Sequence, residues 1–172
     1  MIDFFARLLR QPEYIHVLIN PLPIYGLAMG LIGLAIALLL RSRPAKIATL
    51  AIVLLSAASA WPVAELGEQA SDRVLTMADD DGRAWLKAHE KRADLFIFYF
   101  YGLAALTAVA LAAPLKWPKS SAALALAVLL CGCVVLGMGG YIAYAGGKIR
   151  HREFRNEPPP EKASALDTPS AP

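Results

Sequence analysis

The sequence predicts an all-α integral membrane protein, a four-helix bundle that crosses the bilayer. Of its 172 residues, 57% are hydrophobic, whereas roughly half is usual for soluble domains. The charged residues fall between long apolar stretches instead of being spread along the chain. Each of four such stretches is long enough to cross a hydrocarbon core of about 30 Å as a helix rising about 1.5 Å per residue.

We expect the four membrane spans at residues 21–40, 47–63, 95–113 and 121–144. Pro23 suits the start of the first span, because proline costs least in the first turn of a helix. A polar loop is expected at residues 65–82. The third span should continue a longer helix that begins in water with His89 and its charged neighbours. Residues 113–114 and 146–147 are expected to end the third and fourth helices.

Two flanking segments differ from the transmembrane domain at residues 15–155. Residues 1–14 alternate apolar and charged side chains, which predicts an amphipathic helix on the membrane surface. Residues 156–172 are rich in proline, alanine and serine, the composition of a disordered tail.

The three histidines are predicted to share one face of the membrane. Four spans place both termini and residues 65–88 on the same side. His16 precedes the first span, His89 precedes the third and His151 follows the fourth. Neutral imidazole is the commonest metal ligand, and haem takes one or two axial histidines. The pattern therefore favours a b-type haem, or a transition metal ion (copper, iron or zinc), bound at this face.

Cations and carboxylates lie near these histidines in the sequence. Four cations could contact haem propionates: Arg92, Lys148, Arg150 and Arg152. Glu13 or Glu90 could complete a three-histidine ion site without a porphyrin. The structural alternative stays open, because histidine is common at membrane interfaces and glycine-rich spans are usually packing motifs.

Other function classes find little support. Cys131 and Cys133 point to different faces of a helix, so we expect no disulfide between them and a packing role. The sequence shows no basic stripe with aromatics for nucleic acid, and no hydrolase or phosphoryl-transfer motif. A transporter is the weakest class, since no charge lies inside a span and no internal repeat is apparent.

Three parts of the chain together resemble the DUF2231 family of predicted four-span membrane proteins. They are IHVLINPLPIYGLAMG (15–30), GEQASDRV with AHEKRADLF (67–74 and 88–96), and GGYIAYAGGKIRH (139–151). The family has no established activity. Its members are sometimes joined to redox domains, so the resemblance suggests electron transfer.

We therefore expect an electron-transfer module or subunit rather than an independent enzyme. Its partners would be lipid and other membrane or periplasmic redox proteins, and a homo-oligomer is possible. The alternative is a non-catalytic accessory subunit of a membrane complex. We expect a bacterial-type inner membrane. The histidine face and both termini should be periplasmic, because the short turns opposite carry only cations: Arg41, Arg43, Lys46, Lys116 and Lys119.

Overall fold

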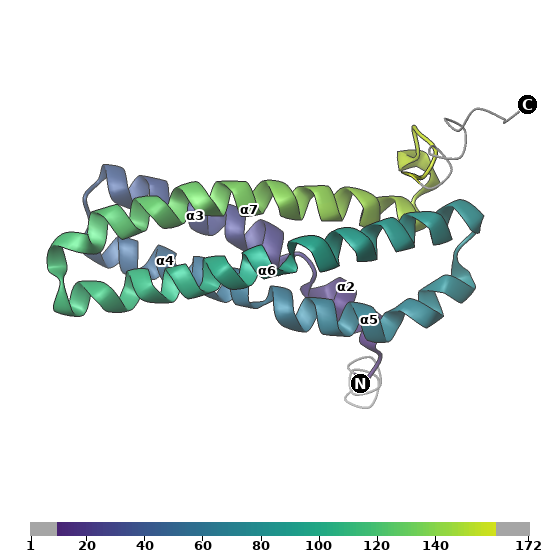
Figure 1. The fold of residues 1–172 in the computed structure, drawn as a ribbon, viewed down its shortest axis with the longest axis horizontal. Coiled ribbons are helices and arrows are strands. Elements are labelled where there is room, and N and C mark those ends of the chain that lie inside the picture. The colour runs from purple at the N-terminus through teal and green to yellow at the C-terminus, as the bar shows by residue number, and fades with distance from the viewer. Residues whose placement is uncertain (1–9, 161–172) are drawn as a thin grey trace, which may run out of the picture.

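A computed structural model describes residues 10–160, which form a bundle of four long helical segments (Figure 1). The elements are α2 (Pro12–Ile19), η1 (Leu22–Gly26), α3 (Leu27–Leu39), α4 (Arg43–Ala58), α5 (Ala60–Met77), α6 (Asp80–Lys116), η2 (Pro118–Ser120), α7 (Ser121–Arg150) and η3 (Arg152–Phe154). Four helical stretches are long and apolar enough to span a membrane: Pro12–Leu39, Arg43–Met77, Asp80–Lys116 and Pro118–Arg150. The predicted all-α, four-span membrane bundle is confirmed. The interfacial helix expected at residues 1–14 and the tail at 156–172 lie largely outside the described residues.

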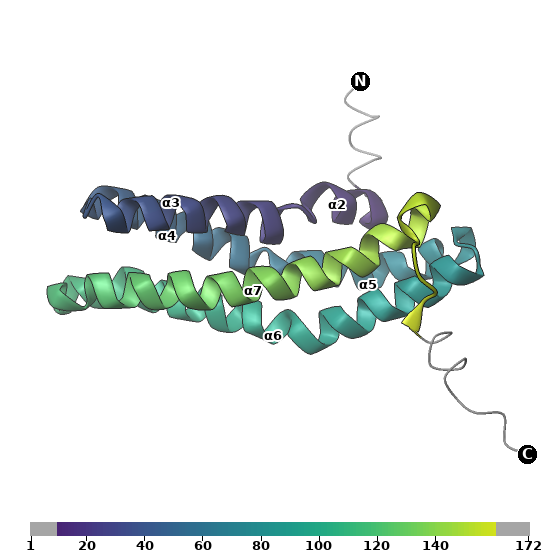
Figure 2. The same ribbon diagram turned by 90° about the horizontal axis from the view of Figure 1, so that it is seen from above.

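The four segments run antiparallel and form a ring. In the half that contains α3, the neighbours around the ring are α3, α4, α6 and α7, so α3 lies diagonally across from α6. In the other half α2 packs against α5, α5 against α6, and α6 against α7. The α5–α6 connection and both ends of the described chain lie toward one end, which we call the histidine end (Figures 1 and 2). The α3–α4 and α6–α7 connections form the opposite end, which we call the turn end.

The first segment is interrupted between α2 and α3. Its five-residue element η1 is a π-helix, in which each turn is wider than in an α-helix. Pro21 and Pro23 lack the N–H groups that a regular α-helix would use here. The interruption separates α2, which carries His16, from the membrane-spanning α3.

Close packing of α3 on α4 depends on glycine. A Cβ atom placed on Gly26 would lie 2.5 Å from Ser56 Oγ, and one on Gly30 would lie 2.8 Å from Val53 Cγ2. Small residues at such crossings let two membrane helices approach closely. The core around them is aliphatic and includes Leu27 and Leu34, both fully buried.

A tight turn joins α3 to α4. Arg41 has a left-handed φ of 52°, and its N–H donates to the Leu38 carbonyl at 3.1 Å. The N–H of Ser42 donates to the Ala37 carbonyl, also at 3.1 Å. This pair of hydrogen bonds is a Schellman motif, in which glycine usually occupies the left-handed position.

The polar loop predicted at residues 65–82 is wrong, because α5 continues as a helix to Met77. Only Ala78 and Asp79 separate α5 from α6. The polar part of α5 is held by its neighbours: the Ser71 hydroxyl donates to Glu90 of α6, and Arg73 pairs with Glu13 of α2. These tertiary contacts extend a helix whose hydropathy pattern ends much earlier.

The third and fourth helices also run beyond their expected ends. Pro114 lies inside the last turn of α6, which continues to Lys116. Proline disturbs a helix only locally here, because the helix ends two residues later. The α7 helix passes through Gly146 and Gly147 to Arg150. Gly146 serves close packing rather than helix termination, as described below.

Candidate functional site

The imidazole of His16 fastens α2 to α5. Its Nδ1 atom lies 2.8 Å from the backbone carbonyl oxygen of Val63. The ring rests against Gly67, where an added Cβ atom would lie 2.9 Å from His16 Cε1 and 3.1 Å from Nδ1. Any other residue at position 67 would have to displace the ring.

The imidazole of His89 makes the same contact between α6 and α7. Its Nδ1 atom lies 3.0 Å from the carbonyl oxygen of Ile142. A Cβ atom on Gly146 would lie 3.1 Å from both Cε1 and Nδ1 of this ring. His89 therefore fastens the second helical hairpin as His16 fastens the first.

The two contacts repeat in the spacing of their acceptors. In each, the accepting carbonyl belongs to the residue four positions before the glycine, Val63 before Gly67 and Ile142 before Gly146. In a helix this carbonyl also accepts the N–H of that glycine. No internal repeat was apparent in the sequence, but the structure contains the same histidine–carbonyl–glycine contact twice. The sequence signal was short: VAELG at 63–67 and IAYAG at 142–146.

These hydrogen bonds determine the tautomer of both neutral imidazoles. A backbone carbonyl only accepts, so Nδ1 carries the hydrogen in the neutral form of each imidazole. The lone pair of Nε2 is then available, and this is the arrangement found in metal-ligating histidines, whose other ring N–H is held by a carbonyl or carboxylate. His16 and His89 are both half-buried. The structure places these two predicted ligands in the half of the bundle formed by α2, α5, α6 and α7.

His151 belongs to a different environment. It follows α7, its side chain is 57% exposed, and its Nδ1 lies 2.9 Å from Glu153 Oε1. Its ring stacks on Phe154 with centroids 5.0 Å apart. Among residues 10–160, no group of three or more His, Cys, Asp or Glu side chains could hold a metal ion. The three-histidine ion site with Glu13 or Glu90 is therefore not assembled in this part of the chain.

The four predicted propionate partners all make contacts within the protein. Arg92 lies one turn after His89 and donates to the Tyr141 carbonyl at 2.9 Å. Its guanidinium carbon lies 3.8 Å from the centroid of the Tyr141 ring. Arg150 contacts the sulfur of Met77 at 3.9 Å. Arg152 pairs with Asp79 at 2.9 Å. Of these three cations, only Arg92 lies on the same helix as His16 or His89: it shares α6 with His89.

Lys148 is the most constrained of the four cations. Its side chain is 2% exposed, and Nζ donates to the Tyr144 hydroxyl at 2.6 Å and to Glu157 at 3.0 Å. The ammonium also lies 4.4 Å from the centroid of the buried Trp85 ring. This buried ammonium already has partners within the protein, so it is poorly placed to pair with a haem propionate.

The sequence did not reveal the link between Asp79 and Arg155. Asp79 caps α6 by accepting the Gly82 N–H at 2.8 Å. Arg155 donates to both Asp79 oxygens at 2.9 Å and to the carbonyls of Lys148 and Ile149 at 2.7 Å. The hydrogen bonds from Arg155 and from the Gly82 N–H lower the pKa of Asp79 to about 2. This cluster joins the start of α6 to the end of α7.

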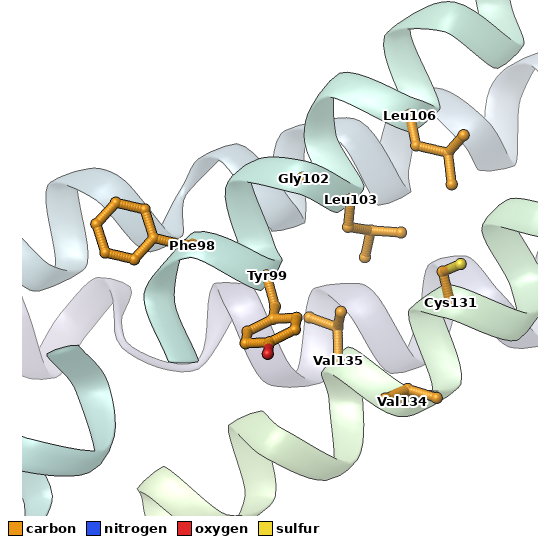
Figure 3. Close-up of a pocket in the computed structure, with 8 residues that line it drawn as sticks. All are labelled: Phe98, Tyr99, Gly102, Leu103, Leu106, Cys131, Val134 and Val135. Carbon is orange, nitrogen blue, oxygen red and sulfur yellow. The ribbon is translucent and has the colours of Figure 1, made fainter. Parts of the chain in front are cut away.

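Two surface hollows in the described part of the chain lie away from the histidines. One, of about 340 Å³, is an apolar groove between α6 and α7 (Figure 3). It is lined by Phe98, Tyr99, Gly102, Leu103, Leu106, Cys131, Val134 and Val135. Cys131 and Cys133 are unpaired, as predicted, but both are exposed rather than packed in the core. The other hollow, of about 180 Å³, lies at the turn end.

No family model, curated protein or solved structure matches this chain.

Proposed function

We propose that this integral membrane protein holds a b-type haem between His16 and His89 and serves as an electron-transfer module or subunit. The observation that carries the proposal is the pair of imidazoles at the histidine end. Each has Nδ1 held by a backbone carbonyl and Nε2 available, and both lie in the half of the bundle formed by α2, α5, α6 and α7. Haem bound there would supply one-electron chemistry, and His16 and His89 would be the residues that hold it.

The number of ligands favours haem over a bare ion. A porphyrin provides four nitrogens, so two histidines complete the coordination of its iron. A structural zinc ion needs four ligands, and a catalytic one usually needs three from the protein. With no cluster of three or more candidate ligands among residues 10–160, zinc is the least suitable of the ions. A single copper ion held by two imidazoles is the remaining ion variant.

The helix that carries His16 is connected loosely to the rest of the first segment. Among the described helices, α2 packs chiefly on α5, and η1 separates it from α3. Arg92 is the cation best placed for a propionate, because it lies one turn from His89.

Two further points belong to this proposal. Five of the six residues of the repeated contact, all but Val63, lie within the stretches that resemble DUF2231, and we propose that the chain belongs to that family. The orientation with the histidine end periplasmic in a bacterial inner membrane rests on the five cations of the turn end.

A non-catalytic accessory subunit is the second candidate. Each imidazole already makes one hydrogen bond and packs against a glycine, which suffices for a histidine that only joins two helices. In that case His16 and His89 would contribute to stability and bind nothing.

Absorption spectroscopy and elemental analysis of the purified protein distinguish the candidates. We expect a Soret band that shifts on reduction, and its loss in His16→Ala and in His89→Ala. His151→Ala is the matched control, because this exposed ring contacts neither of the paired histidines, and it should retain the band. Stoichiometric copper without a Soret band would support the ion variant. A colourless, metal-free protein from cells supplied with haem precursor and copper would refute the proposal and leave the accessory subunit.

A further inference from the structure

The hollow at the turn end is lined by cations. Arg43 and Lys46 of α4 form one wall, and Pro114, Pro118 and Ser121 complete the lining from the α6–α7 connection. Lys46 Nζ donates to Ser121 Oγ at 3.0 Å, which joins the first turn of α4 to the start of α7 across the hollow. An ammonium has three donors, so Lys46 keeps two for a further acceptor.

The turn end contains no acidic residue that could neutralise these cations. The chain has no Asp or Glu between residues 14 and 64 or between 95 and 152. The same end carries three more cations, Arg41, Lys116 and Lys119. The hollow therefore lies in a region of uniformly positive charge, where an anion would be attracted.

The position of the hollow identifies the kind of anion. It lies where two membrane-spanning helices end, next to Trp117, whose side chain is 60% exposed. Exposed tryptophan is typical of the depth of lipid headgroups. Basic pockets between membrane helices at this depth take the phosphates of anionic lipids.

We propose that Arg43, Lys46 and Ser121 form a binding site for the phosphate group of an anionic phospholipid. Arg43 and Lys46 would pair with the phosphate, and the Ser121 hydroxyl would donate to one of its oxygens. The lipid tails would lie along the apolar surfaces of the neighbouring helices α4 and α6. This site is at the opposite end of the bundle from the histidines and does not depend on the proposed haem.

The test compares lipid retention by the full-length protein in detergent micelles, measured by native mass spectrometry. Phosphatidylglycerol should bind more tightly than phosphatidylcholine. Removing a cation of the hollow should weaken phosphatidylglycerol binding by roughly fivefold, the factor for about 1 kcal/mol per basic residue. Arg43→Gln tests the exposed cation alone, and Arg43→Gln/Lys46→Gln tests both. Lys116→Gln/Lys119→Gln is the matched control with the same loss of charge outside the hollow, and it should keep the preference.

Two outcomes would overturn the proposal. If Arg43→Gln/Lys46→Gln and Lys116→Gln/Lys119→Gln weakened phosphatidylglycerol binding equally, only the general positive charge of the turn end would matter. Inorganic phosphate that stabilises the wild-type protein as much as phosphatidylglycerol, and competes with it at similar concentration, would show a site for free phosphate instead of lipid. Circular dichroism would confirm that Arg43→Gln is folded, so that loss of binding is not loss of structure.

Discussion

Replacing Gly67 or Gly146 by alanine should destabilise the protein, although alanine is the better helix former. The added methyl group would lie 2.9 Å from the ring of His16 in the first case and 3.1 Å from that of His89 in the second. Each ring would have to move away from the carbonyl to which it donates. Gly67→Ala should have the larger effect, because its contact is closer.

The magnitude follows from three contributions. Overpacking costs about 1–3 kcal/mol, and loss of the hydrogen bond costs about 0.5–1.5 kcal/mol. Better helix propensity offsets about 0.8–1 kcal/mol of this. The free energy of unfolding should therefore fall by about 0.5–3.7 kcal/mol.

Gly102 and Gly137 are matched controls from the same two helices as the His89 contact. A Cβ atom at either position meets no atom within 4 Å. Gly102→Ala and Gly137→Ala should therefore leave the free energy of unfolding unchanged or raise it by up to about 1 kcal/mol. Unfolding in mixed micelles of increasing denaturing detergent would measure all four variants. If Gly67→Ala and Gly146→Ala were as stable as the controls, the repeated contact would have no energetic role.

Three other predictions concern the connections between helices. Arg41→Gly should raise the stability by about 0.5–1 kcal/mol, because glycine adopts the left-handed φ of 52° without strain; an unchanged or lower melting temperature would contradict this. Because the folded pKa of Asp79 is depressed to about 2, its stabilising contribution is present above about pH 4 and is lost as the pH falls toward 2. Asp79→Asn should thus lower the melting temperature at pH 6 but scarcely at pH 2, and an equal decrease at both would argue against the ion pair. Single cysteines introduced at residues 78 and 160 in a Cys131→Ser/Cys133→Ser background should react with an impermeant maleimide from one side of the membrane, and a cysteine at residue 43 from the other; labelling of 43 and 78 from the same side would rule out the described arrangement.

The fold was predictable where hydropathy alone determines structure. The apolar runs are long enough that each must cross the membrane as a helix, since backbone groups in lipid must be satisfied internally. The polar half of α5 was missed, because its helix depends on contacts such as Ser71 with Glu90. Those contacts join residues that only the folded chain brings together.

The candidate site was predictable in part for a similar reason. Counting the spans placed all three histidines at one end of the bundle, and the positions of His16 and His89 directly before spans favoured them over His151. The carbonyl and the glycine opposite each of these two rings could not be predicted, because they belong to distant parts of the sequence. The role of Arg155 was equally hidden, because a cation after a helix reveals its acceptors only in three dimensions.

The repeated histidine contact gives each half of the chain its own set of the three groups that form it. Residues 12–77 contain one histidine, its carbonyl and its glycine, and residues 80–150 contain a second set. Only Ala78 and Asp79 connect them. Cleavage at that connection should therefore leave two fragments, each with its own fastened hairpin, that reassociate within the bilayer.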